Sequence, residues 1–355
     1  MPHSHADPLA PEFLVRVAGA DLPAPAAADM LHVSVYEDLE APAMFACELL
    51  NWDPDKAVMK WSDGNTFKEG SELEVHLGYR DHLATLIVGE ITALEVSAAS
   101  SDVPRLTVQG FDRSHRLMRD RRVRTFADMT DADIARRVAN EWGLTPRITA
   151  TGERHAYVLQ CNQTDLEFLH ERARRVGFEV IVRDKTLTFR PAPIGHRGPA
   201  TLHREVDLLE FRSRLSTLAP TPRATARAWN PRQKQSIVGR ADADDAIATM
   251  GRTKLGAAVI EDAFGEAQRA SITRPAATQA DADQMARSSF NEAALRYIEA
   301  EGLCLGRTDL RAGEVITIDG VGDRFSGPYY VTSATHSYTP RRGYRTRFSA
   351  RRNAS

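Results

Sequence analysis

Arginine supplies the densest charge in this sequence, and clustered cations can bind phosphate or carboxylate groups. One cluster occupies residues 113–124 and another occupies residues 341–352. A nucleic-acid site needs aromatic side chains interleaved with the cations for base stacking, and only Phe111 and Phe126 flank the first cluster. We therefore expect no nucleic-acid partner and interpret both clusters as solvated surface or subunit contacts. The arginines are Arg113, Arg116, Arg119, Arg121, Arg122 and Arg124, and then Arg341, Arg342, Arg345, Arg347, Arg351 and Arg352.

Histidine is the next candidate for chemistry, but its spacing gives no metal or catalytic motif. No HExxH pattern or paired-cysteine pattern occurs, so we expect no metal and no cofactor. His336 lies near Ser333, Ser337 and Asp319, which would allow a hydrolytic triad, but no GxSxG turn surrounds either serine. We expect His336 to be an ordinary strand residue and the chain not to be an enzyme. The other histidines outside the N-terminal tail are His32, His76, His82, His115, His155, His170, His196 and His203.

The remaining composition excludes several protein classes. Cys47, Cys161 and Cys304 are far apart and odd in number, so we expect buried free thiols instead of a disulfide framework or a four-thiolate zinc site. The 355 residues carry a formal net charge of -2, which gives no general attraction to nucleic acid or anionic membranes. We find no signal-peptide pattern and no apolar run of roughly 18 residues, as a membrane span needs. We therefore expect synthesis in the bacterial cytoplasm and no direct membrane insertion.

The elements that would position these residues are mostly strands. From about residue 13 to residue 112 short runs alternate apolar and polar residues, which is typical of antiparallel strands with one buried face. The period then changes, because Thr130 with Asp133 and Thr164 with Glu167 are helix-start patterns, and Gly143 and Gly177 are stop signals. A hairpin follows over residues 178–191. A third helix is predicted from Thr278 to Gly302, and strands return after it.

These patterns predict a mainly β protein of the α+β class. We expect a disordered tail over residues 1–12, a first β-barrel over 13–121 and an α/β insertion over 122–204. A second β-barrel would combine 205–240 with 300–355, and a loop and helix insertion would occupy 241–299. Residues 241–277 are polar, rich in alanine and weakly periodic, so a long loop is expected there.

Two segments of the predicted barrels resemble each other. Residues 67–70 (FKEG) precede the strand ELEVHLG and the strand GEITALEV, and residues 310–313 (LRAG) precede EVITIDG and PYYVTSATH. Each segment has a glycine turn, a strand, a second glycine and a strand with a central threonine. The pattern indicates either an internal duplication or two unrelated hairpins with similar turns.

Five segments in the same order give the chain a family resemblance. They are GEITALEV, DRSHRLMRDRRVRTF, CNQTDLEFLHERARRVGFEVIV with TLTFRP, WNPRQKQSIVGRA, and LRAGEVITIDGVGDRFSGPYYVTSATHSY. Together they resemble the late control gene D family over about residues 13–353. That family includes the central hub of contractile phage tails and the N-terminal hub part of valine-glycine repeat (VgrG-type) spike proteins.

The resemblance implies two related, tube-type antiparallel β-barrel domains in a homotrimer with pseudo-sixfold symmetry. It implies a structural baseplate hub that initiates the inner tube and adapts its sixfold symmetry to a threefold spike. The implied partners are other copies of the chain, a separate spike trimer, the inner tube ring and baseplate wedge proteins in an assembled tail or extracellular particle. Because the sequence stops at Ser355, just after RTRFSARRN, we expect either that the spike is a separate polypeptide or that the chain has been cut short.

Two other functions remain open at this stage. A cargo or effector adaptor of the same machine would use residues 241–277 to bind its load. A peptidoglycan hydrolase at the tail tip would use His336. The machine itself could be a phage tail, an extracellular injection system or a type VI apparatus.

Overall fold

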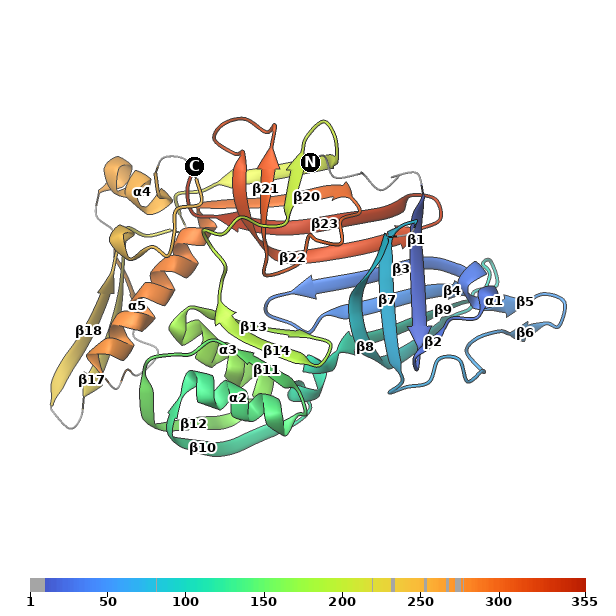
Figure 1. Ribbon diagram of the computed structural model, residues 1–355, viewed down its shortest axis with the longest axis horizontal. Helices are drawn as coiled ribbons and strands as arrows, with labels where there is room; N and C mark the ends of the chain where they lie inside the picture. Colours follow the sequence, from blue (N-terminus) through green and yellow to red (C-terminus); the bar gives the residue numbers. More distant parts are fainter. Residues whose placement is uncertain are drawn as a thin grey trace.

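The computed structural model describes residues 10–80, 82–218, 220–230, 234–251, 254–265, 268–271, 276 and 278–355. Strands dominate these residues and the longer helices lie at one side, which confirms the expected mainly β fold (Figure 1). Residues 1–9 of the expected tail lie outside the described residues, and Pro11 already begins the first strand. Within the described residues, no helix is both long enough and apolar enough to cross a membrane.

A single thirteen-stranded sheet forms the main body of the molecule. Two groups of strands curl around separate hydrophobic cores, one around Phe45 and Leu73 and the other around Tyr329 and Phe348. Figure 1 shows the first group in blue and teal; in the second group β15 and β16 are yellow-green and the other strands are orange to red. Along the sheet path the first group is β3 (Met30–Asp38), β4 (Met44–Leu50), β9 (Arg105–Asp112), β8 (His82–Ser97), β7 (Glu72–Tyr79), β1 (Pro11–Val17) and β2 (Ala20–Asp21). The second is β16 (Leu208–Leu215), β20 (Ile298–Leu305), β23 (Gly343–Arg352), β22 (Gly327–Thr339), β21 (Val315–Asp319) and β15 (Ala200–His203).

Five strands of the first group correspond to five strands of the second group. The two sets follow one another along the chain in the same way and occupy the same relative places in the sheet. We call β3, β4, β7, β8 and β9 the first β unit, and β16, β20, β21, β22 and β23 the second β unit. In both units the first two strands pair with each other, the last strand lies beside the second, and the third and fourth form the following pair. The flanking strands differ, because β1 is antiparallel to β7 whereas β15 is parallel to β21.

The registers of the two units also agree, including two β-bulges. The first and second strands of each unit shift register once, between Met30 and His32 in β3 and between Leu208 and Glu210 in β16. The fourth and fifth strands shift once as well. These shifts lie between Ile91 and Ala93 in β8 and between Val331 and Ser333 in β22.

Backbone hydrogen bonds outside the ladders repeat in the same way. The amide of Gly70 donates to the carbonyl of Ile91 at 2.8 Å, and the amide of Gly313 donates to the carbonyl of Val331 at 2.9 Å. Both glycines have positive φ, 79° and 81°, which favours glycine over residues with a Cβ. Two further amide-to-carbonyl hydrogen bonds of the first unit have equivalents in the second. The bond from Leu50 to Asp29 matches that from Leu305 to Asp207, and the bond from Asn51 to Pro104 matches that from Gly306 to Tyr344. These matches show that the two units share one topology and one register, as an internal duplication would produce.

The two units meet along one strand pair, which we call the intrachain seam. Residues 333–338 of β22 pair antiparallel with residues 33–38 of β3. Figure 1 shows these strands side by side where the two groups join. The first half of β22 pairs with β21, so this long strand serves both units. At the far side of the first group, Phe13 of β1 returns to Tyr338 of β22, with ring centroids 4.9 Å apart.

The α/β insertion follows the first unit and has a hydrophobic core of its own. Both predicted helix starts are confirmed, because Thr130 and Thr164 form capping boxes with Asp133 and Glu167. Gly177 ends the second helix in the left-handed conformation, with φ of 71°. The elements are the 3-10 helix η1 (Arg113–Met118), β10 (Arg121–Thr130), α2 (Asp131–Glu141), β11 (Thr145–Ile148), β12 (Arg154–Thr164), α3 (Asp165–Val176), β13 (Phe178–Arg183) and β14 (Thr186–Pro191).

A second insertion separates the first two strands of the second unit. Here the structure differs from the expected barrel over 205–240, because β17 (Arg223–Asn230) and β18 (Gln235–Ala241) form a separate sheet with β19 (Gln268–Ser271). The reason is packing, since Ala224 and Ala226 lie in a core with Phe290 of α5 (Gln279–Ala294) and not in the main-sheet cores. The expected loop also contains α4 (Gly256–Phe264) and the 3-10 helix η2 (Ala243–Asp245), while parts of 241–277 lie outside the described residues.

The third helix begins as predicted but ends earlier. Thr278 caps α5 by accepting a hydrogen bond from the amide of Asp281, whereas the helix stops at Ala294 and a 3-10 turn, η3 (Leu295–Tyr297), follows. Gly302, predicted as its stop, lies inside strand β20. A Cβ at Gly302 would lie 2.4 Å from the Phe348 ring, so this glycine permits a close contact between strands. The remaining short elements are α1 (Ala24–Ala28), β5 (Trp52–Asp53) and β6 (Val58–Met59).

Candidate functional site

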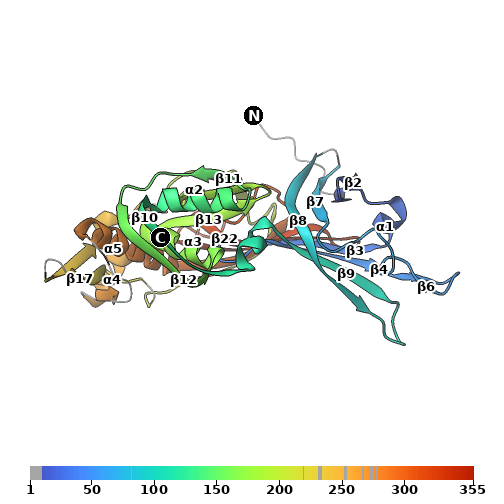
Figure 2. The same ribbon diagram turned by 90° about the horizontal axis from the view of Figure 1, so that it is seen from below.

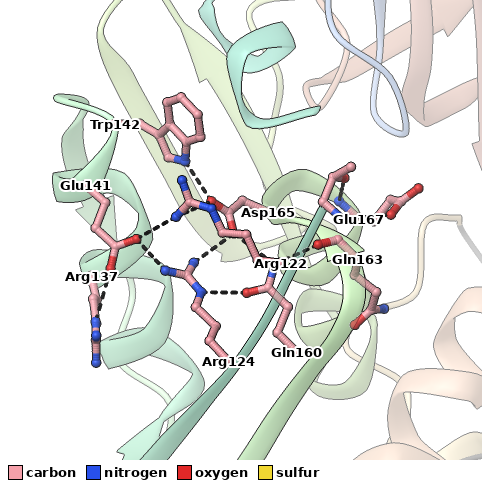
Figure 3. Close-up of polar contacts among 10 residues, drawn as sticks. Arg122, Arg124, Arg137, Glu141, Trp142, Gln160, Gln163, Asp165 and Glu167 are labelled. Atoms are coloured by element: carbon pink, nitrogen blue, oxygen red, sulfur yellow. Dashed lines mark hydrogen bonds and ion pairs between the residues drawn. The ribbon is translucent and has the colours of Figure 1, made fainter. Parts of the chain in front are cut away.

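The first arginine cluster is largely neutralised by carboxylates of the same chain. Asp165 begins α3, and its side chain is only 1% exposed. Arg124 donates to Asp165 at 2.7 Å and to Glu141 at 2.5 Å, and Arg122 lies 3.2 Å from the other Asp165 oxygen (Figure 3). The indole nitrogen of Trp142 also donates to Asp165, at 2.8 Å. This network joins β10 to both helices of the α/β insertion.

The electrostatics of that network favour the ionised form of Glu141. Burial alone would raise the pKa of Glu141, but hydrogen bonds and charges from Arg124 and Arg137 outweigh burial and lower it. Arg122 also stacks over the Trp142 ring, 5.2 Å from its centre. The cations are therefore paired within the chain and do not form an open phosphate-binding surface.

The N-terminal part of the same cluster surrounds Glu90 of β8. Arg116 donates its Nε to Glu90 at 2.8 Å, and the His115 Nε2 lies 2.9 Å from the same carboxylate oxygen. Arg113 bridges Glu90 and Glu72. Burial raises the pKa of Glu90, but Arg116 and His115 outweigh burial and lower it. This cluster fixes the 3-10 helix η1 against the first β unit.

The residues of the possible hydrolytic triad are not brought together. His336 is fully buried in the intrachain seam, and its Nδ1 lies 2.8 Å from the Tyr344 hydroxyl and 3.3 Å from the Thr346 hydroxyl. Asp319 instead lies 3.4 Å from His203. Burial lowers the pKa of His336 to about 4, so the ring is neutral at pH 7.

One further His and carboxylate cluster was not singled out from the sequence. Asp131 contacts His155 at 3.2 Å and also accepts from Arg172, and all three side chains are buried. Arg172 lies on α3 and Asp131 begins α2, so the cluster joins the two helices. Nothing in the sequence places these residues together, because 41 positions separate Asp131 from Arg172. In the described residues no group of three His, Cys, Asp or Glu side chains is arranged to hold a metal ion.

The cysteines differ in their surroundings. Cys47 and Cys304 are buried, as expected, whereas Cys161 is exposed on β12. Burial raises the pKa of both Cys47 and Cys304 to about 12. These two thiols are therefore protonated core residues at pH 7.

A buried ion pair joins strand β3 of the intrachain seam to the segment that precedes β21. Glu37 of β3 is 6% exposed, and the Arg311 Nε donates to both of its oxygens at 2.9 Å. The Ala312 amide also donates to Glu37, at 3.2 Å, and Arg311 donates to the carbonyl of Leu86 at 2.6 Å. Burial raises the pKa of Glu37, but Arg311 outweighs burial and lowers it. The candidate functional feature is thus the intrachain seam, where the Glu37–Arg311 pair holds the two β units together.

Comparisons with known proteins place this fold among tail proteins. The 43 kDa tail protein of prophage MuSo2 from Shewanella oneidensis has a TM-score of 0.71 and 14% identity, covering 96% of this chain and 98% of that chain. The tail protein from Neisseria meningitidis MC58 has a TM-score of 0.70 and 13% identity, covering 96% of each chain. The E. coli c3393 protein, described as a component of the type VI secretion system, has a TM-score of 0.56 and 14% identity, covering 96% of this chain and 77% of that chain.

At these identities the likeness shows a shared fold. No match was found among curated protein sequences. The family model that matches is described as the Alg8 N-terminal domain, and it covers residues 10–340. The late control gene D resemblance therefore stays an expectation. The matched model covers the first β unit, both insertions and the second β unit except strand β23. This chain belongs to the Alg8 N-terminal domain family.

Proposed function

We propose that this chain is a structural baseplate hub of a phage tail or contractile injection system. In this role three copies form a ring that adapts the sixfold inner tube to a threefold spike. The observation that carries the proposal is the duplicated β unit, with matching strand order, registers and bulges. Three chains with two such units each present six similar surfaces while the ring repeats only three times.

The similarity of fold to proteins described as tail proteins supports this role. The partners in this proposal are two further copies of the chain, a separate spike trimer, the inner tube ring and baseplate wedge proteins. The chain would be made in a bacterial cytoplasm and act in an assembled tail or particle. It would work by binding partners and would not catalyse a reaction.

Sedimentation of the purified chain, alone and with candidate tube and spike proteins, tests the proposal. We expect a three-copy particle, either alone or on addition of a tube or spike protein, and a ring with six lobes in electron micrographs. A protein that stays monomeric over a wide concentration range and binds neither partner would contradict the hub function.

A further inference from the structure

The intrachain seam joins one strand of each unit, but the equivalent strand of each opposite unit has no such partner within the described residues. In the seam, the second half of β22 pairs with β3, so the fourth strand of the second unit joins the first strand of the first unit. The equivalent strands of the opposite units are β8 and β16. Among the described residues, the second half of β8 pairs only with β9, and β16 pairs only with β20. Each therefore presents one free backbone edge, which proteins normally cover or protect.

Side chains at these two free edges are more exposed than the equivalent side chains in the intrachain seam. The register of β8 on β9 matches that of β22 on β23, which makes Val96 the equivalent of His336. His336 is 0% exposed under β3, whereas Val96 is 47% exposed. On the other strand, the equivalent of the buried Val33 is Phe211, which is half-buried. Apolar side chains thus stand partly exposed where their equivalents are covered.

We propose that residues 93–98 of one copy pair antiparallel with residues 211–216 of a second copy, which repeats the intrachain seam between chains. The proposal rests on the proposed function for the number of copies in the ring, but the pairing itself follows from the duplication. The register is fixed by the seam, where Ala334 lies opposite Glu37, Thr335 opposite Tyr36 and His336 opposite Val35. Its equivalents place Leu94 opposite Leu215, Glu95 opposite Arg214 and Val96 opposite Ser213.

The chemistry of these predicted pairs is complementary. Glu95 and Arg214 are exposed, and neither takes part in an ion pair with another described residue. Opposite charges directly across two antiparallel strands stabilise their pairing. Leu94 and Leu215 point toward the cores of their own units and are only partly buried, so the pairing would cover both. In Figure 2 the β8–β9 hairpin projects beyond the body of the molecule, which leaves its edge accessible.

The pairing joins different surfaces of the two copies, so it is head-to-tail. Such contacts either close into a ring or continue as a filament. In a closed ring of three copies, intrachain and interchain seams alternate, and every β unit has neighbours on both sides. Another copy of this chain is therefore the partner that we infer for the free edges of β8 and β16.

Cysteine cross-linking tests the register directly. Cys161 is exposed, so we replace it by serine first, and Cys47 and Cys304 stay because they are buried. Chains with Glu95→Cys and chains with Arg214→Cys are then mixed under assembly conditions, with the tube protein present, and oxidised. We expect a covalent two-chain product in the mixture, because side chains directly opposite on antiparallel strands lie within disulfide reach.

Two matched variants control this experiment. Arg212→Cys lies on the same exposed face two residues away, and with Glu95→Cys it should give much less product, because the diagonal distance is too long. Tyr36→Cys with Thr335→Cys in one chain should form an intrachain disulfide, since these residues are directly opposite in the existing seam. This second variant shows that the oxidation conditions suit such a pair.

The outcomes separate this inference from the hub function. A three-copy ring that cross-links no better through positions 95 and 214 than through 95 and 212 overturns the pairing but leaves the hub function standing. Cross-linking of Glu95→Cys chains to one another also overturns it, because that product requires a head-to-head contact. A protein that neither assembles nor cross-links in the presence of tube protein overturns both.

Charge reversal gives an independent readout that needs no oxidation. Glu95→Arg should abolish the ring at a concentration where the unchanged protein is fully assembled, because two arginines would face each other. The double variant Glu95→Arg with Arg214→Glu should restore assembly. Failure of the double variant to assemble better than Glu95→Arg alone contradicts the pairing.

Discussion

At the scale of single residues, the Glu37–Arg311 pair joins the two β units. Replacing Arg311 by methionine would leave a buried carboxylate without its cation, and breaking a buried pair in this way costs about 3–5 kcal/mol. We expect the free energy of unfolding of Arg311→Met to fall by roughly that amount at pH 7, as measured by urea denaturation. The double variant Glu37→Leu with Arg311→Met should recover much of the loss.

The pH dependence of this effect has a defined sign. The pKa of Glu37 is lowered below its ordinary value of 4.5, so its stabilising contribution is complete above pH 4.5 and is lost as the pH falls through the folded-state pKa. The difference in stability between the unchanged protein and Arg311→Met should therefore shrink on acidification. A difference that stays constant from pH 7 to below pH 4 would contradict this assignment.

His336 gives a second residue-scale prediction. Its pKa is about 4 in the folded protein against an ordinary value of 6.5, so the unfolded chain binds a proton first as the pH falls. Stability should then decline below pH 6.5 and continue to decline until about pH 4. His336→Gln should flatten that decline, as measured by denaturation at a series of pH values. His82→Gln, at an exposed position, serves as the control and should leave the profile unchanged.

At the scale of elements, the end of α3 is set by Gly177. Its φ of 71° is in the left-handed region, where a Cβ costs about 1–2 kcal/mol. We expect Gly177→Ala to lower the free energy of unfolding by about that amount in thermal or urea denaturation. Gly152→Ala is the matched control, because Gly152 does not have positive φ and a Cβ there would meet no atom within 4 Å. Equal losses in the two variants would contradict the role of the left-handed conformation.

The elements also show what could be read from the sequence. The capping boxes at Thr130 and Thr164 were predictable because each involves only residues three positions apart. The role of Gly302 was not, because it depends on Phe348 of a neighbouring strand. The separate sheet of β17 and β18 was missed for a similar reason, since alternation indicates a strand but does not reveal which core it faces.

The candidate site was predictable to a smaller extent. The sequence drew attention to the arginine cluster, but it did not reveal partners such as Asp165, which lies 41 positions from Arg124. The glycine turns at Gly70 and Gly313, with the strand, second glycine and central threonine that follow each of them, were the local signs of the duplication. The matching bulges and registers required the three-dimensional structure, because pairing between strands leaves little trace in either strand alone.

At the scale of the whole molecule, assembly should make stability depend on concentration. Anything that binds only the folded chain raises the unfolding temperature by mass action, and further copies of the chain would act in this way. We expect the unfolding midpoint to rise when the protein concentration is increased roughly hundredfold, as measured by differential scanning fluorimetry. The Glu95→Arg variant should show a midpoint that does not change with concentration. A constant midpoint in the unchanged protein would contradict assembly over that range.

The covalent link between the two β units has a consequence for how the protein can change over generations. In a ring of six identical chains, every substitution would appear six times. A residue that contacts a threefold partner would then also occur in the subunits that do not contact that partner. Here one unit has Glu37 where the other has Leu215, although the strands keep the same register. Duplication within one gene therefore lets alternate positions of such a ring diverge, while the shared backbone geometry keeps them interchangeable as building blocks.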